Sequence, residues 1–234
     1  MSTNESWLNT DQCRQLSLLE AAIVQNQPDI QHLPLALVVG ENQQICWTHY
    51  LTANHVYFKT MQAHELQVSE QDLIVETSHY DCPFLPKSLN LAILPHTLNY
   101  CLNPGLFLAN LTPCLRDDGY LVLFLFERCS LLPWRQKLIK KNHSLVCPYF
   151  HSTLWIKSHL KKWNYLLLRE CKYFFNLPNT SSNPMLKWLS WMGEVRMLLV
   201  KRQETCVTPL KDNWQQAKLY KKTAAVKNNQ HFKD

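Results

Sequence analysis

A histidine stands at the end of one of the two most apolar strands that the sequence predicts. The stretch "PFLPKSLNLAILPHTL" (83–98) holds an apolar run over 89–94, and Pro95 ends the strand because proline cannot donate to a sheet ladder. In open α/β sheets ligands bind beyond the carboxyl ends of strands, which is where His96 is expected. There an imidazole can act as a general base or as a donor that orients a substrate. The alternative is a histidine that bonds to backbone and does no chemistry.

The elements that must position His96 alternate between strands and helices. The predicted strands are 35–39, 55–59, 72–76, 89–94, 120–126, 165–175 and 195–202. The predicted helices are 11–25, 103–115, one around "PWRQKLIKK" (133–141), 152–163 and 183–193. Strands too apolar to face water, with helices between them, indicate a parallel sheet covered by helices.

Local signals sharpen three of these elements. On the helix over 11–25, Leu16, Leu19 and Ile23 are expected on the buried face. Pro113 is expected to kink or shorten the helix that starts at Asn103. Asp118-Gly119 then predicts a turn into the strand 120–126.

Composition favours one large globular domain with extensions. Of the 234 residues, 46% are apolar and 18% are charged. We divide the chain into an N-terminal helical extension (1–32), a main domain (33–210) and a basic tail (211–234) that we expect to be disordered. No apolar run is long enough to predict a membrane-spanning helix, and the first 30 residues do not resemble a secretory signal. Nine scattered cysteines without a C-x-x-C pair are typical of reduced thiols in a cytoplasmic protein and argue against a structural zinc site.

Charge is divided unevenly along the chain. Residues 1–130 carry 5 Lys/Arg and 13 Asp/Glu, whereas residues 131–234 carry 19 Lys/Arg and 5 Asp/Glu. A basic half can attract nucleic acid, an acidic protein or, through its tail, an anionic membrane surface. The alternative is that the positive half complements the negative one and is simply solvated.

The segment 82–126 carries a recognisable pattern. Pro83-Phe84, Ser88 and Asn90 precede and enter a strand, and after a helix Asp118-Gly119 leads into the next strand. This pattern resembles the class I S-adenosylmethionine-dependent methyltransferases of the type 11 kind, with Asn90 in place of their usual aspartate. More narrowly, it is similar to a small gammaproteobacterial family of methyltransferase-like proteins with no assigned substrate. The resemblance covers 33–210 in element order and is specific in residues over 82–126, with weaker agreement at 195–210.

The resemblance implies a fold and a cofactor. The fold is α/β and Rossmann-like: a seven-stranded, mostly parallel sheet of order 3-2-1-4-5-7-6, with strand 7 antiparallel and helices on both faces. The activity would be transfer of a methyl group from S-adenosylmethionine to an unidentified acceptor, which could be a small molecule, a nucleic acid or a protein.

The resemblance also assigns residues to the cofactor. Gly40 and Glu41 would meet its amino-acid end. Glu76, Ser78 and Asp81 would lie near its adenosine, and Leu94 and His96 would lie at the reacting centre. The family usually has several glycines after strand 1 and an acid at the end of strand 2, where this chain has Gly40 alone and Lys59-Thr60. The alternative is therefore a methyltransferase fold whose cofactor binding is reduced or lost.

The C-terminal half also interleaves aromatic and basic side chains. They are Trp134, Arg135, Lys137, Lys140, Lys141, Trp155, Lys157, Lys161, Lys162 and Trp163. Rings beside cations are how single-stranded nucleic acid is held without sequence readout, so a noncatalytic protein that binds RNA or an acidic partner is the rival hypothesis. On the helix 152–163, however, we expect Trp155 and Trp163 to pack inward and the lysines to form a solvated face.

Overall fold

The computed structural model describes residues 11–40, 47–60, 73–78, 80–126, 149–173 and 195–203. Some predictions lie outside these residues: Glu41 as a cofactor ligand, the helices over 133–141 and 183–193, and the disordered tail 211–234. The predicted strand 72–76 is described from Leu73, and the predicted strand 165–175 is described to Tyr173.

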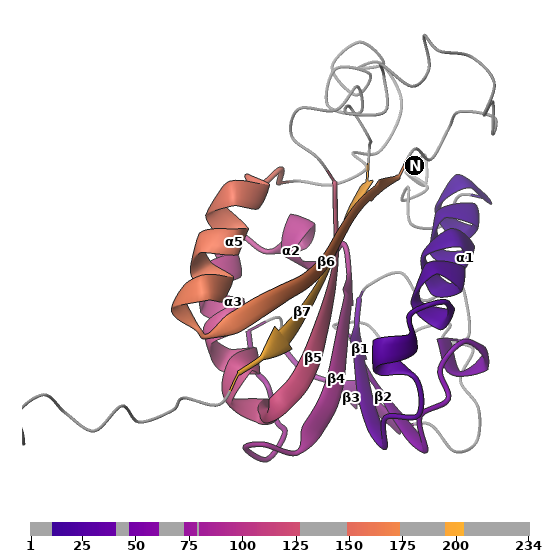
Figure 1. Cartoon of the computed structure of the whole chain (residues 1–234), viewed down its shortest axis with the longest axis horizontal. Coiled ribbons are helices and arrows are strands. Elements are labelled where there is room, and N and C mark those ends of the chain that lie inside the picture. Colours follow the sequence, from indigo (N-terminus) through magenta and orange to yellow (C-terminus); the bar gives the residue numbers. More distant parts are fainter. Residues whose placement is uncertain are drawn as a thin grey trace, which may run out of the picture. The chain divides into compact units, whose positions relative to one another are not determined.

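The described residues form a seven-stranded sheet (Figure 1). Its strands are β1 (Leu35–Val39), β2 (His55–Thr60), β3 (Leu73–Glu76), β4 (Leu89–Pro95), β5 (Leu115–Phe126), β6 (Tyr165–Tyr173) and β7 (Val195–Arg202). The order is β3-β2-β1-β4-β5-β7-β6. β7 runs antiparallel to both of its neighbours, β5 and β6, while the other pairs are parallel. The predicted order and the predicted antiparallel strand are confirmed.

Helices cover both faces of the sheet (Figure 1). α1 (Asp11–Gln25) lies on one face, and α2 (Thr97–Tyr100), α3 (Pro104–Leu111) and α5 (Thr153–Lys162) lie on the other. The short 3-10 turns are η2 (Pro28–Ile30), η3 (Trp47–His49) and η4 (Thr112–Cys114).

α3 begins where the sequence predicts but ends four residues before the predicted end at 115, and Leu115 already belongs to β5. The Asn103 side chain accepts a hydrogen bond from the backbone N–H of Leu106, and Pro104 occupies the first turn, where its missing N–H costs nothing. The helix ends at Leu111, and the chain tightens into a 3-10 turn at Pro113.

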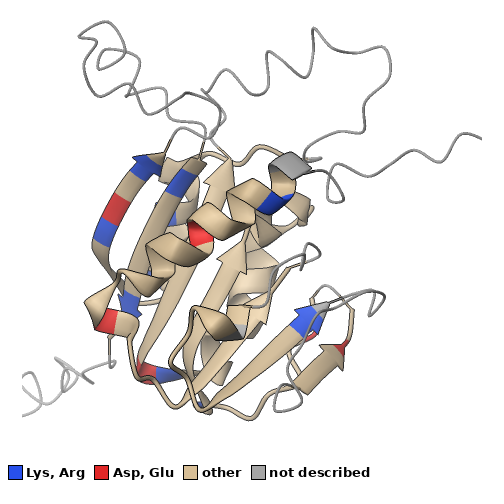
Figure 2. Ribbon diagram, turned by 90° about the vertical axis from the view of Figure 1, so that its right-hand side faces the viewer, with Lys and Arg blue, Asp and Glu red and all other residues tan. Residues whose placement is uncertain are grey.

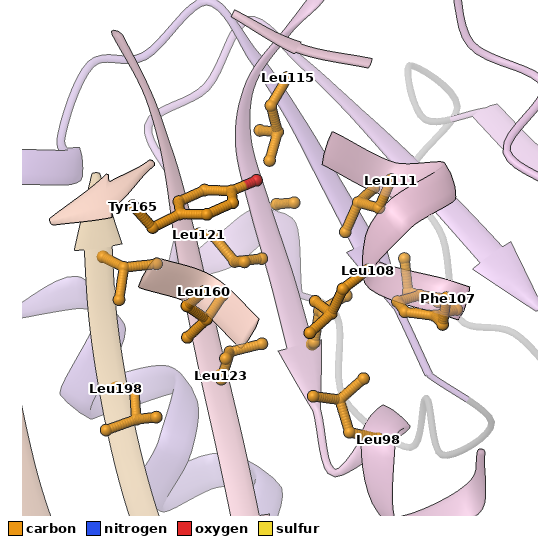
Figure 3. Packing of buried hydrophobic residues seen from close by; sticks show 14 of the residues in the cluster. Leu98, Phe107, Leu108, Leu111, Leu115, Leu121, Leu123, Leu160, Tyr165 and Leu198 are labelled. Carbon is orange, nitrogen blue, oxygen red and sulfur yellow. The ribbon is translucent and has the colours of Figure 1, made fainter. Parts of the chain in front are cut away.

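Alternate residues of each central strand serve two separate cores. Leu91, Ile93, Val122 and Phe124 belong to the cluster under α1. The residues between them belong to the cluster under α2, α3 and α5: Ala92, Leu94, Leu121 and Leu123. Figure 3 shows the second cluster, with helix side chains such as Leu98, Leu108 and Leu111 near Leu121 and Leu123 of β5. Because a strand presents successive side chains to opposite faces, the continuous apolar runs of the sequence supply both cores.

The buried face of α1 differs from the predicted one. Leu19 is 39% exposed, whereas Leu16, Glu20 and Val24 are buried. The prediction of Leu19 on the buried face is therefore wrong, and the stripe that meets the sheet is rotated toward a face containing an acid. The spacing of the leucines did not predict this face, because apolar residues lie around much of the circumference of α1.

Asp118-Gly119 forms a bulge within β5 rather than a turn before it. Leu89 pairs with Leu115 and Leu91 pairs with Tyr120, so β5 has extra residues between the two pairs. A Cβ at Gly119 would come within 3.0 Å of the Arg116 carbonyl oxygen. Glycine is needed here because the backbone folds closely onto itself.

The surface of the sheet's β6 edge carries charges of both signs (Figure 2). Glu170 of β6 pairs with Lys157 of α5 and Arg196 of β7. Charged side chains at an edge strand discourage pairing with another chain. The exposed fractions of two tryptophans correct a prediction: Trp155 and Trp163 are each 39% exposed and do not pack inward.

Among the described residues no helix is long and apolar enough to span a membrane.

Candidate functional site

The carboxyl ends of β1 and β4 lie side by side. The two strands pair in parallel. Thr97, two residues beyond β4, donates a hydrogen bond from its Oγ1 to the carbonyl oxygen of Val39, the last residue of β1. Gly40 and His96 therefore follow neighbouring strand ends, as the sequence predicts.

Gly40 is buried directly after β1. Its N–H donates to the carbonyl oxygen of Lys59 in β2 over 3.3 Å. The backbone of Gly40 is thus fixed to the sheet at the start of the predicted cofactor loop, and Glu41 lies outside the described residues.

His96 has an unusual backbone conformation. Its φ is 54° and its ψ is 6°, which is left-handed helical. For a residue other than glycine this costs about 1–2 kcal/mol. Two backbone hydrogen bonds hold His96 in this conformation. Its N–H donates to the carbonyl oxygen of Phe124 over 3.0 Å, and its carbonyl oxygen accepts from the backbone N–H of Asn99 over 2.8 Å. Strained residues that the surroundings hold in place cluster at functional sites.

The ring of His96 is buried against α1 and β5. It stacks on Phe126 with the ring centroids 3.7 Å apart and an interplanar angle of 14°. Its Nε2 lies 2.6 Å from Oε1 of Glu20, and both side chains are almost wholly buried. A carboxylate oxygen can only accept, so the Nε2–H of His96 donates, and in the neutral ring Nδ1 then carries the lone pair. Nδ1 is buried and has no hydrogen-bond partner among the described residues.

This arrangement bears on the two alternatives for His96. Within the described residues the ring bonds to no backbone atom but to the Glu20 carboxylate, which holds its orientation. A histidine oriented in this way presents one ring nitrogen as an acceptor or, when protonated, as a donor. Both of the chemical roles that the sequence suggests are thus available to Nδ1.

Glu20 was not identified from the sequence. It lies 76 residues before His96, and only the packing of α1 on the sheet brings the two together. A signal does exist, because Glu20 is four residues from both Leu16 and Val24 and so interrupts a stripe of apolar residues. Cys13 lies on the same side of α1, where burial, and next the charge of Glu20, raise the pKa of its thiol far above the usual value.

Lys59 occupies the end of β2, opposite Val39 of β1. Its side chain is almost wholly buried; the ammonium lies 5.5 Å from the centre of the Phe107 ring and donates to the carbonyl oxygen of Asp81. Burial lowers the pKa of Lys59, and the neighbouring Cys82 and Asp81 oppose that effect. The resemblance to methyltransferases implies a ribose-binding acid at this end of β2. This chain has Lys59 there, which cannot accept hydrogen bonds from ribose hydroxyl groups.

Ser78 and Asp81 form a turn after β3. The Ser78 hydroxyl donates to Oδ2 of Asp81 over 2.6 Å, and the Asp81 N–H donates to the Ser78 carbonyl oxygen over 3.2 Å. Both residues and Glu76, at the end of β3, are exposed. These three predicted adenosine contacts thus lie at the end of β3 and in the segment that follows it. The hydrogen bond from Lys59 to the Asp81 carbonyl oxygen connects this segment to β2.

Leu94 lies one strand position before Pro95, and its side chain is fully buried in the cluster under α2, α3 and α5. Its side chain therefore packs in the core, on the side opposite to Ile93, and a contact with a ligand would have to come from its backbone. Leu94 as a cofactor contact stays a prediction.

Comparisons with known proteins support the fold. No protein-family model matches the chain. A 76-residue stretch is 33% identical to the uncharacterized protein YafS of Escherichia coli (strain K12), and the match spans 32% of this chain and 32% of that protein.

Solved structures share the architecture over most of the chain. A methyltransferase dependent on S-adenosylmethionine from Thermotoga maritima has a TM-score of 0.62 at 15% identity, covering 82% of this chain and 91% of that one. Another from Mesorhizobium loti has a TM-score of 0.57 at 11% identity, covering 79% and 96%. Geranyl diphosphate C-methyltransferase of Streptomyces coelicolor A3(2), solved with S-adenosyl-L-homocysteine, has a TM-score of 0.56 at 9% identity, covering 81% of each chain. At these identities the likeness establishes the class I methyltransferase fold.

Proposed function

We propose that this chain is an S-adenosylmethionine-dependent methyltransferase with a reduced glycine loop, acting on an acceptor that is still to be identified. One observation carries the proposal. His96, buried and left-handed, stands at the carboxyl end of β4 beside the end of β1, with its tautomer fixed by Glu20. Neighbouring strand ends in the middle of a parallel sheet are where this kind of fold binds ligands.

The described residues fit the cofactor at the reacting centre better than at the ribose. At the centre, Nδ1 of His96 is a buried polar atom without a described partner, which favours a ligand or substrate group there. At the adenosine, the exposed carboxylate of Asp81 can accept from hydroxyl or amino groups. At the end of β2, Lys59 offers no acceptor, so we expect weaker ribose binding than in relatives with an acid there.

Each residue has a distinct role in the proposal. Gly40 and Glu41 border the cofactor's amino-acid end. Glu76, Ser78 and Asp81 border its adenosine, and Leu94 and His96 border the methyl group. The cofactor supplies an electrophilic methyl carbon. His96 accepts the proton that the acceptor's nucleophile loses, or donates a hydrogen bond that aims the nucleophile.

Glu20 acts through His96. Its carboxylate accepts from Nε2 and so keeps the lone pair on Nδ1, while Phe126 holds the plane of the ring. Methyl transfer by direct displacement depends chiefly on alignment of the reacting atoms. A base whose ring cannot rotate favours that alignment.

Cytoplasmic residence is part of the proposal. It is supported by described cysteines that are thiols outside any disulfide, namely Cys82, Cys114 and Cys171. Burial raises the pKa of Cys82 to about 12, so its thiol stays protonated and unreactive at neutral pH.

Calorimetric titration of the full chain with S-adenosylmethionine and S-adenosylhomocysteine tests the proposal, with adenosine as a control ligand. We expect saturable heat and a rise in the melting temperature for both cofactor forms. The variant His96→Asn, which tolerates the left-handed conformation, should keep binding and lose methyl transfer. Absence of heat and of a thermal shift at millimolar cofactor would contradict the proposal and favour the noncatalytic rival.

A further inference from the structure

A groove lies between α3 and α5, and His96 is not among the residues that line it. Its volume is about 500 Å³, within the range of ligand-binding sites. Leu106 and Ala109 of α3 form one wall, and Trp155 and Trp163 at the two ends of α5 form the other. Both indole rings are partly exposed, so the groove offers aromatic surface to a ligand.

The aromatic surface extends beyond the groove. The rings of Trp155 and His159 lie 3.8 Å apart between centroids and are tilted by 34°, and the rings of His151 and Tyr149 continue the series at 6.3 and 6.1 Å. This row of rings runs from the segment before α5 into the helix, and rings exposed in this way can act as platforms on which bases stack. Such stacking contributes about 1–3 kcal/mol per base and does not depend on base identity.

Gly105 brings α3 close to this row. A Cβ at Gly105 would lie 3.4 Å from Cη2 of Trp155 and 3.5 Å from Cδ2 of His159. These are ordinary van der Waals distances, so the α3 backbone at Gly105 lies directly beside the rings of Trp155 and His159.

The charge of the groove favours an anion. Lys162 and His159 line it, and none of its described lining residues is acidic. The carbonyl oxygen of Trp155 accepts from Nδ1 of His159, so in the neutral ring Nε2 is an acceptor, and the positive charge of the groove comes from Lys162. Flat rings beside the Lys162 ammonium suit a base joined to a phosphate, whereas an acidic peptide would supply charge without a ring to stack.

We propose that the groove between α3 and α5 binds single-stranded RNA, with a base stacked on Trp163 and a phosphate near Lys162. The site is separate from His96, and the inference holds whether or not the chain transfers methyl groups. It also gives the basic C-terminal half a described surface at which a strand could begin to bind.

Fluorescence anisotropy with a labelled twelve-nucleotide oligouridylate tests the proposal on the full chain. We expect binding below about 100 µM protein that weakens steeply between about 50 and 200 mM salt. Trp163→Leu should weaken binding about five-fold or more, the lower limit of one stacked base. Lys162→Ala should weaken it and reduce the salt slope by about one.

Lys161→Ala is the matched control. Lys161 is the preceding residue of α5, carries the same charge and does not line the groove. Its loss should change the affinity less than loss of Lys162, with melting temperatures of all three variants close to that of the wild type. Equal losses for the two lysines, together with no effect of Trp163→Leu, would overturn the proposal, because binding would then follow diffuse charge. Absence of binding, equal binding of a duplex, or equally effective competition by uridine monophosphate would overturn it too.

Discussion

The two faces of the sheet are built from the same strands but differ in what they bury. The face under α2, α3 and α5 is filled by aliphatic and aromatic side chains of neighbouring elements (Figure 3). The face under α1 is as apolar along the strands, yet at the carboxyl edge it buries Glu20 against His96. Since the first face packs without such a carboxylate–imidazole pair, packing does not require one. The proposed function gives the pair a role that packing alone does not require.

The largest expected effect is on the aliphatic face. Leu123→Ala should lower the free energy of unfolding by about 2–5 kcal/mol, because it leaves a cavity beneath α3 and α5. Urea unfolding measures this change. The affinity for S-adenosylhomocysteine should remain within two-fold under conditions where the variant is folded. A large loss of affinity would show that the two faces are not functionally distinct.

A smaller effect is expected where α1 meets His96. Glu20→Leu should lower the free energy of unfolding by about 1–3 kcal/mol, because the buried Nε2–H of His96 loses its acceptor. Glu20→Gln is the matched control, since its amide oxygen can accept the same hydrogen bond and should preserve most of the stability. If both variants are as stable as the wild type, the Glu20–His96 bond does not hold the two elements together.

The sequence predicted the sheet more fully than the site. Apolar runs bounded by Gly40, Pro95 and Gly119 mark three strand ends or irregularities, and the order follows from the resemblance over 82–126. These signals are local, so they can be read along the chain. The contact between Glu20 and His96 spans 76 residues and depends on how α1 is rotated on the sheet. Side-chain periodicity alone selected the wrong face of that helix.

Local sequence patterns also did not predict which aromatic side chains are exposed. The exposure of Trp155 and Trp163 depends on how α3 and α5 lie relative to each other, since both helices line the groove. The helix 152–163 itself was predicted to within one residue. The sequence therefore predicts the helix, whereas the tertiary arrangement determines which of its side chains line the groove.

On the aliphatic face, one buried polar bond should have a modest effect. The Tyr165 hydroxyl donates to Oγ1 of Thr112 over 3.2 Å, and burial raises the pKa of Tyr165 to about 12. Tyr165→Phe should lower the free energy of unfolding by about 0.5–1.5 kcal/mol at neutral pH. Because the pKa is higher in the folded chain, the wild type should also lose stability as pH rises above about 10, and the variant should lose less. Identical unfolding curves at pH 7 and pH 11 for both proteins would contradict this.

The smallest expected effect is a change in how steeply the free energy of unfolding varies with pH at alkaline pH. Burial lowers the pKa of Lys59, so the unfolded chain binds a proton that the folded chain has released. Between the lowered pKa and the ordinary value near 10.5, this contribution makes unfolding less favourable as pH rises. Lys59→Met should lack the contribution, which urea unfolding at several pH values would measure as a difference between the two proteins. Parallel curves would mean that folding does not lower the pKa of Lys59.

The central claim is that Nδ1 of His96 faces a cofactor site at the carboxyl edge of the sheet. Nuclear magnetic resonance of the full chain labelled with ¹⁵N-histidine tests it most directly, with the His96 signals assigned by their absence from His96→Asn. We predict an unprotonated Nδ1 and a protonated Nε2 in the free protein, and a clear shift of both signals on adding S-adenosylhomocysteine. Signals of His96 that stay unchanged at millimolar S-adenosylhomocysteine would contradict the claim.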